Sequence, residues 1–342
     1  MPESGTIRVG VVGVGAFGRN HARVYRELAQ QGGVQLAAVV DADPAAAAAA
    51  GKQFDAPVVS SLAALKGSVD AVSIAVPTVE HLAVARELME AGIDVLIEKP
   101  LASSLAEADE LIRLAQRTGR IVQVGHLERF NPAVRATVPL LTRPLFFEVH
   151  RLSVFTPRSL DVDVVLDLMI HDLDVVLSFV DSPVKEIRAV GLPILSDKVD
   201  IANVRMEFDS GCVANFTASR VSTERVRKLR FFQPHQYISI DYTRQDLMVF
   251  SVDPAKAAEV PGELLPSANP GIGMQKPPVT SEEPLRAELR SFLDAVRTRS
   301  RPLVALEDGR RALAVALDVL AAIREHSRRL RLDVLSPQVP RK

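Results

Sequence analysis

The sequence has 342 residues, and its 47% hydrophobic and 24% charged residues are typical of folded globular proteins and exclude a disordered or collagen-like chain. Basic residues number 41 and acidic residues 42, so the net charge of −1 argues against a protein that binds nucleic acid through its phosphates. At roughly 150 residues per domain, this length predicts two domains.

The cysteine content and the length of the apolar runs indicate in which cellular compartment the protein is found. The single cysteine, Cys212, excludes a disulfide framework and a cysteine-based zinc site and is typical of a reducing environment. The first residues enter a predicted strand without the pattern of a secretion leader, and the apolar runs fall short of the ~20 residues of a membrane span. We therefore expect a cytoplasmic protein that has neither membrane nor nucleic-acid partners.

The first 126 residues alternate short apolar strands with segments of helical length. Such alternation predicts a doubly wound parallel sheet with helices on both faces, that is, an α/β domain over residues 1–126. The predicted strands are Ile7–Val12, Val34–Val40, Ala71–Val76, Val95–Ile97 and Ile121–Val124, and the predicted helices end near Gln30 or span Asp43–Phe54, Val79–Ala91 and Leu105–Gln116.

After residue 126 a two-residue period replaces this alternation, and Asp209-Ser210-Gly211 separates two such runs as a hairpin turn would. We expect an α+β domain over residues 127–330, built on a large, mostly antiparallel open sheet, with a tail over 331–342. The predicted strands are 146–154, 184–190, 201–208, 212–219, 228–232, 237–241 and 246–251, followed by a long surface loop over 253–279 and helices that begin at the capping pattern 280–283 and at 306.

A glycine-rich segment follows the first predicted strand. Gly13, Gly15 and Gly18 form a G-x-G-x-x-G pattern that leaves a strand and opens a helix, the context in which this pattern binds a dinucleotide. Gly15 permits close approach of a pyrophosphate, and the free N–H groups at Ala16 and Phe17 begin the helix that binds the anion. The alternative, a turn without a ligand, accounts less well for this context.

The end of the second predicted strand carries the acidic residue that such a site requires. Asp41 lies 23 residues after Gly18, close to the ~20 expected of a carboxylate that accepts from the adenosine ribose. No arginine follows that could pair with a 2′-phosphate, so the sequence favours NAD over NADP. Asp43, before Pro44, is predicted to cap the next helix.

Glu98-Lys99-Pro100 follows the strand at 95–97 and so lies at the carboxyl edge of the predicted sheet, where ligands bind in open α/β folds. A fixed ammonium group there suits hydride transfer, because it stabilises a substrate oxygen whose charge changes. The alternative is that the two neighbouring charges simply pair with each other.

The apolar segment 163–180 is predicted to be a largely buried helix. Asp163, Asp167, His171 and Asp174 follow helical spacing and would form one polar stripe. We interpret His171 as the acid/base that exchanges a hydroxyl proton and Asp167 as the carboxylate that orients it. A satisfied core network is the alternative, and a zinc site lacks a third nitrogen or sulfur ligand.

Four short segments follow one another along the chain: Gly13–Gly18, Val76-Pro77-Thr78 with His81, Glu98-Lys99-Pro100, and Asp167 with His171. As an ordered set they resemble the Gfo/Idh/MocA family of NAD(P)-dependent oxidoreductases. The resemblance covers nearly the whole chain and implies a Rossmann domain followed by a substrate and oligomerisation domain.

The same resemblance implies roles for individual residues. Lys99, Asp167 and His171 would form the catalytic group, and the cofactor site would include Pro77, Thr78, His81, Glu98 and Lys99 beside the glycine loop and Asp41. The segment before Asp167, residues 161–165, departs from the family pattern, because it lacks the glycines usual there.

The segment Gly125–Pro132 resembles the family members that act on nucleotide-linked amino sugars. It implies oxidation of UDP-N-acetylglucosamine at C3 to the 3-keto sugar. Basic residues could hold the diphosphate, although most of them could equally be solvated strand edges. The candidates are Arg129, Arg151, Arg158, Arg220, Arg225, Arg227 and Lys228, from which we select Arg129, Arg151 and Arg220, together with Asn131, as substrate-binding residues.

Two other functions remain open at this point. A free-sugar or inositol dehydrogenase would turn over substrates without a nucleotide and would tolerate replacement of the arginines. A regulator that binds NAD(P) without chemistry would be indifferent to Lys99→Ala. In every case the broad sheet of the second domain predicts a homo-oligomer.

Overall fold

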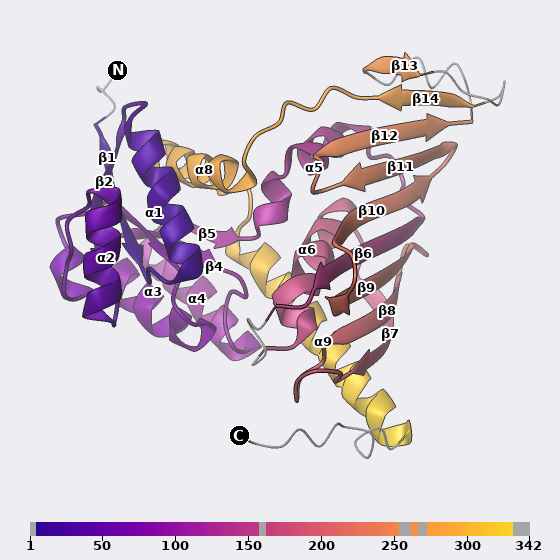
Figure 1. Cartoon of the computed structure of the whole chain (residues 1–342), viewed down its shortest axis with the longest axis horizontal. Coiled ribbons are helices and arrows are strands. Elements are labelled where there is room, and N and C mark those ends of the chain that lie inside the picture. Colours follow the sequence, from indigo (N-terminus) through magenta and orange to yellow (C-terminus); the bar gives the residue numbers. More distant parts are fainter. Residues whose placement is uncertain (1–4, 157–161, 253–260, 266–271, 331–342) are drawn as a thin grey trace. The chain divides into compact units, whose positions relative to one another are not determined.

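The computed structural model describes residues 5–156, 162–252, 261–265 and 272–330. Contacts divide the chain into two compact units (Figure 1). The first unit comprises the described residues up to Leu127 together with Glu283–Leu313, and the second comprises Glu128–Glu282 and the described residues from Ala314. Arg158, Asp161 and the expected tail 331–342 lie outside the described residues.

In the first unit the described strands form a five-stranded parallel sheet of order β2-β1-β3-β4-β5, as the alternation predicts. The strands are β1 (Ile7–Val12), β2 (Val34–Val40), β3 (Ala71–Ile74), β4 (Asp94–Glu98) and β5 (Val122–Gly125), and the helices are α1 (Ala16–Ala29), α2 (Pro44–Phe54), α3 (His81–Glu90) and α4 (Leu105–Thr118). The chain goes outward from β1 to β2 and then returns to β3. The loops after β1 and β3 therefore diverge and leave a crevice at their carboxyl ends.

Helix α8 (Pro284–Thr298) packs in the first unit. The sequence instead predicts that all of residues 127–330 form the second domain. The apolar residues Leu285, Leu289 and Phe292 of α8 belong to the same buried cluster as Val9 and Val11 of β1. Figure 1 shows α8 beside α1. Burial of this apolar face, rather than order in the chain, decides where the helix packs.

In the second unit the described strands form a nine-stranded sheet of order β13-β14-β12-β11-β10-β6-β9-β8-β7, antiparallel except where β6 pairs with β9. The hairpin predicted at 209–211 joins β8 and β9, with Gly211 at φ +82°. The strands are β6 (Phe146–Val154), β7 (Val184–Leu192), β8 (Ile201–Phe208), β9 (Val213–Ser222), β10 (Val226–Gln233), β11 (Gln236–Asp241), β12 (Asp246–Ser251), β13 (Glu263–Leu265) and β14 (Gly273–Lys276).

The prediction of a surface loop over residues 253–279 is wrong in part, because two short strands lie within it. Strand β14 pairs with the edge of β12, and β13 pairs with β14. The prolines and glycines of this segment hide any two-residue period, whereas the open edge of β12 offers backbone groups that a short strand can pair with.

The helices of the second unit are α5 (Pro132–Thr137) and α6 (Ile170–Phe179), and α9 (Leu306–Leu330) begins in the first unit and continues in the second. Helix α6 covers one face of the sheet (Figure 1). The ring centroid of Phe179 in α6 lies 6.0 Å from that of Phe231 in β10. No helix among the described residues combines the length and apolarity required to cross a membrane.

Two local predictions about helices are wrong. Asp163 precedes the helix, and its carboxylate accepts from the Val199 N–H at 2.9 Å, so it does not belong to a polar stripe. The pattern at 280–283 does not cap α8, because the side chain of the N-cap residue, Glu283, accepts from Arg23 and not from the helix backbone, and the Ser281 hydroxyl donates to Gln245. Pro284 in the first turn begins this helix instead.

Candidate active site

A cavity of about 830 Å³ lies in the first unit at the carboxyl ends of β1, β2 and β3. This is the crevice that the strand order predicts. It is lined by Val12, Gly13, Gly15, Val40, Asp41, Ala42, Ser60, Ser61, Leu62, Ala75, Val76, Pro77, Glu80 and Val84.

The glycines of the loop after β1 are required for different reasons. Gly13 has φ +85°, and a Cβ there would lie 2.6 Å from the Ala75 carbonyl oxygen. A Cβ at Gly18 would lie 1.8 Å from the Gly13 carbonyl oxygen, so this glycine lets α1 approach the loop. Gly15 has no heavy atom within 4 Å of such a Cβ, which leaves room for a ligand at the start of α1. Ala16 and Phe17 are exposed in the first turn of α1.

Asp41 is oriented by the backbone around it. One carboxylate oxygen accepts from the Val14 N–H at 2.7 Å and the other from the Asp43 N–H at 2.9 Å. Each oxygen retains a lone pair that can accept from a ribose hydroxyl. Asp43 caps α2 as predicted, accepting from the Ala45 N–H at 2.9 Å. The cavity, the open space at Gly15 and the placement of Asp41 fit NAD.

His81 is buried and connects two loops of the first unit. Its Nε2 lies 3.1 Å from the Val76 carbonyl oxygen, and its Nδ1 lies 3.0 Å from that of Pro100. Burial lowers the pKa of His81, which favours the neutral ring. Pro77 lines the cavity, whereas Thr78, which begins the short helix η2 (Thr78–Glu80), and His81 do not. The structure therefore places His81 as a positioning residue between the segments that carry Pro77 and Lys99.

Glu98 and Lys99 stand at the end of β4. The Glu98 carboxylate lies 3.0 Å from His21 Nε2 and accepts from the Lys99 N–H at 3.2 Å. Gly125 provides the space for it, because a Cβ there would lie 2.8 Å from Glu98 Oε1. This contact gives the glycine of the segment 125–132 a structural reason. The Lys99–Pro100 peptide is cis.

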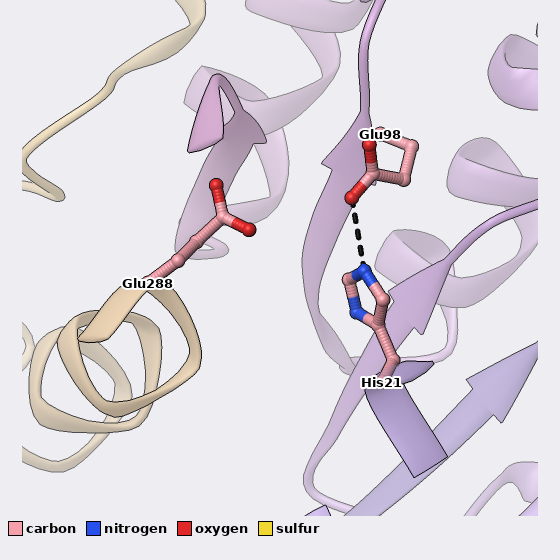
Figure 2. Close-up of side chains that lie close together, drawn as sticks. All are labelled: His21, Glu98 and Glu288. Atoms are coloured by element: carbon pink, nitrogen blue, oxygen red, sulfur yellow. Dashed lines mark hydrogen bonds and ion pairs between the residues drawn. The ribbon is translucent and has the colours of Figure 1, made fainter. Parts of the chain in front are cut away.

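Glu288 of α8 completes a buried cluster that the sequence does not reveal. Figure 2 shows its carboxyl group directed toward His21 and Glu98, and ligand-capable atoms of the three residues lie within 4.8 Å of one another. Neither oxygen of Glu288 has a hydrogen-bond partner among the described residues. Burial and the neighbouring charge of Glu98 raise the pKa of Glu288 well above its usual range, so we expect this group to hold a proton.

Asp167 and His171 lie in the second unit, on successive turns and half-buried. Asp167 belongs to a π-helical turn, η5 (Val165–Met169), and His171 to the first turn of α6. The Ile170 N–H donates to the Val165 carbonyl, five residues back, which widens the helix at this point. Such turns occur frequently at functional sites.

Asp172, the residue after His171, joins this helix to the sheet, and no pattern in the sequence identifies it. Asp172 is buried and accepts from Arg151 Nε at 2.6 Å and Nη2 at 2.9 Å. Arg151 Nη1 donates to Glu128 at 2.9 Å. This buried ion pair, with two hydrogen bonds between the guanidinium and the Asp172 carboxylate, joins α6 to β6.

This network corrects part of the predicted substrate site. Asn131 and Arg151 are each 2% exposed and Arg220 is 5% exposed, which leaves little surface for a ligand. Asn131 caps α5 by accepting from the Ala133 N–H and donates to the Tyr242 carbonyl at 3.0 Å. Arg220 donates to the Val162 carbonyl and lies 3.5 Å from Asp200. Only Arg129 of this set has a more exposed side chain, at 15%, and it lies 3.4 Å from Asp174.

The family models divide the chain in the same order as its motifs. The model of the oxidoreductase family with an NAD-binding Rossmann fold matches residues 7–126, and the Gfo/Idh/MocA C-terminal domain matches residues 143–238.

Similar proteins extend this match over nearly the whole chain. UDP-N-acetylglucosamine 3-dehydrogenase of Acidithiobacillus ferrooxidans is 38% identical over 93% of this chain and 97% of its own length. A solved structure of that enzyme has a TM-score of 0.85 at 37% identity, covering 93% of this chain and 97% of the other. An inositol 2-dehydrogenase of Acidothermus cellulolyticus is 31% identical over 56% of this chain and 58% of its own length. The chain therefore belongs to the Gfo/Idh/MocA family of NAD-binding oxidoreductases.

Proposed function

We propose that this protein is a cytoplasmic, NAD-dependent dehydrogenase that oxidises UDP-N-acetylglucosamine at C3 to the 3-keto sugar. The observation that carries the proposal is the 38% identity to the Acidithiobacillus enzyme of that name over 93% of this chain. The inositol dehydrogenase match covers only 56% of the chain, so a free polyol is the second candidate.

In the first unit the residues proposed to bind the cofactor surround the cavity. The backbone N–H groups at Gly15, Ala16 and Phe17 would receive the pyrophosphate, because the start of α1 offers unsatisfied donors. Asp41 would accept from the adenosine ribose. When bound, NAD⁺ supplies the acceptor for the hydride.

The reaction breaks a C–H bond and an O–H bond of the sugar and forms a C=O bond. We assign the hydroxyl proton to His171, with Asp167, four residues earlier, as the carboxylate that orients the imidazole. We assign Lys99 to the substrate oxygen, where its ammonium stabilises the negative charge that develops as the O–H bond breaks. The hydride and the proton leave from the same CH–OH group, so the step balances with NAD⁺ as the oxidant and His171 as the proton acceptor.

Self-association belongs to the same proposal. Across β6, β10, β11 and β12, the rings of Phe146, Phe232, Tyr237 and Phe250 follow one another with centroids 5.9, 4.9 and 5.2 Å apart. Phe232 is 40% exposed. A half-exposed aromatic row across an open sheet is typical of a surface that another copy covers.

NADH absorbance tests the activity. The purified protein and NAD⁺ are mixed with UDP-N-acetylglucosamine, glucose or myo-inositol, and Lys99→Ala is the control. We expect a signal from the nucleotide sugar that Lys99→Ala abolishes. Turnover of myo-inositol or glucose alone would identify the second candidate, and NAD binding without any turnover would favour a regulator.

A further inference from the structure

Two arginines face each other across neighbouring strands of the second unit. Arg227 of β10 is registered directly opposite Arg151 of β6. Both lie on the face of the sheet that α6 covers, since Leu229 and Phe231, on the same side of β10 as Arg227, are buried. Like charges directly opposite each other are destabilising. This pair therefore needs compensation.

The two arginines are compensated differently. Arg151 donates to both carboxylate oxygens of Asp172 and to one of Glu128. The other Glu128 oxygen accepts from Asn131 Nδ2 at 3.3 Å. All four carboxylate oxygens of this network are thus already engaged.

Arg227 is left without such partners. Within the described part of the chain no carboxylate lies within the 4.0 Å of an ion pair with its guanidinium. Its Nε is shielded from solvent and has no acceptor there. Burial and the neighbouring charge of Arg151 lower the pKa of Arg227, with Glu128 and Asp172 opposing and Arg225 adding to the effect. A half-buried guanidinium in this state is a built site for an anion.

The position of this cation relates it to the proposed chemistry. Arg151 binds Asp172, and Asp172 follows His171 in α6. Arg227 is therefore connected to the helix that carries the proposed base through Arg151 and one ion pair, within the same unit.

Neighbouring basic residues are poorer candidates. Arg129 lies 3.4 Å from Asp174. Lys228 alternates to the opposite side of β10 and lies 3.9 Å from Asp241. Arg225 is exposed, so solvent compensates its charge.

We propose that Arg227 binds a phosphate of the substrate's diphosphate group and so selects nucleotide sugars over free sugars. The identity of the anion rests on the proposed function, whereas the presence of an anion site at Arg227 does not.

The test compares Arg227→Gln with Arg230→Gln, a control on the same strand but the opposite side. Both variants are saturated with NAD, so that added phosphates do not occupy the dinucleotide site. We expect Arg227→Gln to weaken UDP binding in calorimetry by about tenfold or more, since a charge-assisted contact is lost. Binding of N-acetylglucosamine should not change. Arg230→Gln should bind UDP as the parent protein does.

Ligand-free stability separates a binding role from a structural one. Removing an uncompensated buried charge should leave the Tm of ligand-free Arg227→Gln equal to or above that of the parent protein. Arg227→Lys keeps the charge without the planar fork and should bind UDP with intermediate affinity. The inference would be overturned if Arg227→Gln and Arg227→Lys both had a lower ligand-free Tm than the parent protein. It would also be overturned if Arg227→Gln bound UDP with unchanged affinity.

The same measurements distinguish this inference from the proposed function. Turnover of UDP-N-acetylglucosamine with an unchanged KM in Arg227→Gln would reject the role of Arg227 and retain the activity. Binding of UDP or pyrophosphate through Arg227 without turnover of UDP-N-acetylglucosamine would retain the anion site and reject the substrate.

Discussion

Glu288 illustrates how one residue can make stability depend on pH. Its native pKa is raised above the ordinary value of 4.5 by burial and by Glu98. Between 4.5 and the native pKa, the folded protein holds a proton that the unfolded chain has released, so this group makes stability fall as pH rises through that window.

We expect Glu288→Gln to remove this pH dependence, because glutamine resembles the protonated acid and does not ionise. At neutral pH the variant should be at least as stable as the parent protein. Urea unfolding at a series of pH values measures the effect, and Glu325→Gln, at an exposed position of α9, is the control. A loss of stability that is present at neutral pH and disappears in acid would show that the ionised carboxylate is the native form.

The glycine loop predicts a contrast between two equally small substitutions. Gly18→Ala should destabilise the protein by about 1–3 kcal/mol, because the added methyl group meets the Gly13 carbonyl at 1.8 Å and the backbone must shift. Gly15→Ala meets nothing within 4 Å and should keep the parent stability while it weakens NAD binding. Thermal unfolding and fluorescence titration with NADH measure both. Equal NAD affinity in Gly15→Ala and the parent would contradict the assigned pyrophosphate position.

For single residues, the sequence predicts those roles that depend on nearby positions in the chain. Asp43 caps α2 by accepting from the N–H two residues later, and Asp41 follows the glycine loop at a characteristic spacing. Arg151 and Asn131 depend on partners 21 and 111 residues away, and no local pattern reveals a carboxylate or carbonyl at such separations. The sequence therefore predicts a ligand for Arg151, whereas in the fold two buried carboxylates neutralise its charge.

Among the elements, α6 is held on the sheet by a buried ion pair in addition to its apolar face. Replacing Asp172 by Ala leaves Arg151 charged and buried, with Glu128 as its remaining partner. We expect a loss of about 3–5 kcal/mol in unfolding free energy. The combined replacement Arg151→Met, Asp172→Leu and Glu128→Gln should recover much of it, since no charge of the network is then buried alone. A triple variant as unstable as Asp172→Ala would show that shape rather than charge fixes the helix.

The sequence correctly predicts a helix within residues 163–180, but it predicts wrongly which residues share one face of that helix. Its apolar composition indicates burial, but the spacing argument assumes 3.6 residues per turn. The π-helical turn at 165–169 breaks that assumption between Asp163 and His171. Sequence periodicity contains no signal for one extra residue in a turn, so the acid that anchors the helix, Asp172, was overlooked.

For the molecule as a whole, the aromatic row on the sheet predicts assembly. Phe232→Glu places a charge in the middle of this row and should reduce the sedimentation coefficient to that of a single chain, while the circular dichroism spectrum stays that of the folded parent protein. Leu303→Glu, at a 45% exposed position of the first unit, should leave association unchanged. Identical sedimentation of Phe232→Glu and the parent would place the interface elsewhere.

The overall architecture was the most predictable level, because alternation of strands and helices and a two-residue period extend over many residues. The exception is α8, whose amphipathic face fits either core by composition. Only packing of Leu289 and Phe292 with Val9 and Val11 assigns it to the first unit.

The return of α8 to the first unit has a consequence for synthesis. The apolar core around β1 is incomplete until α8, which ends at residue 298, has left the ribosome. That residue follows the end of the first segment, Leu127, by 171 residues. At about 5–20 residues per second, this interval lasts roughly 10–30 s. During that time the nascent chain already carries all the strands of the nucleotide-binding sheet, yet exposes the apolar surface that α8 will cover. Newly made N-terminal segments are thus natural clients for chaperones, although they contain the whole dinucleotide-binding pattern.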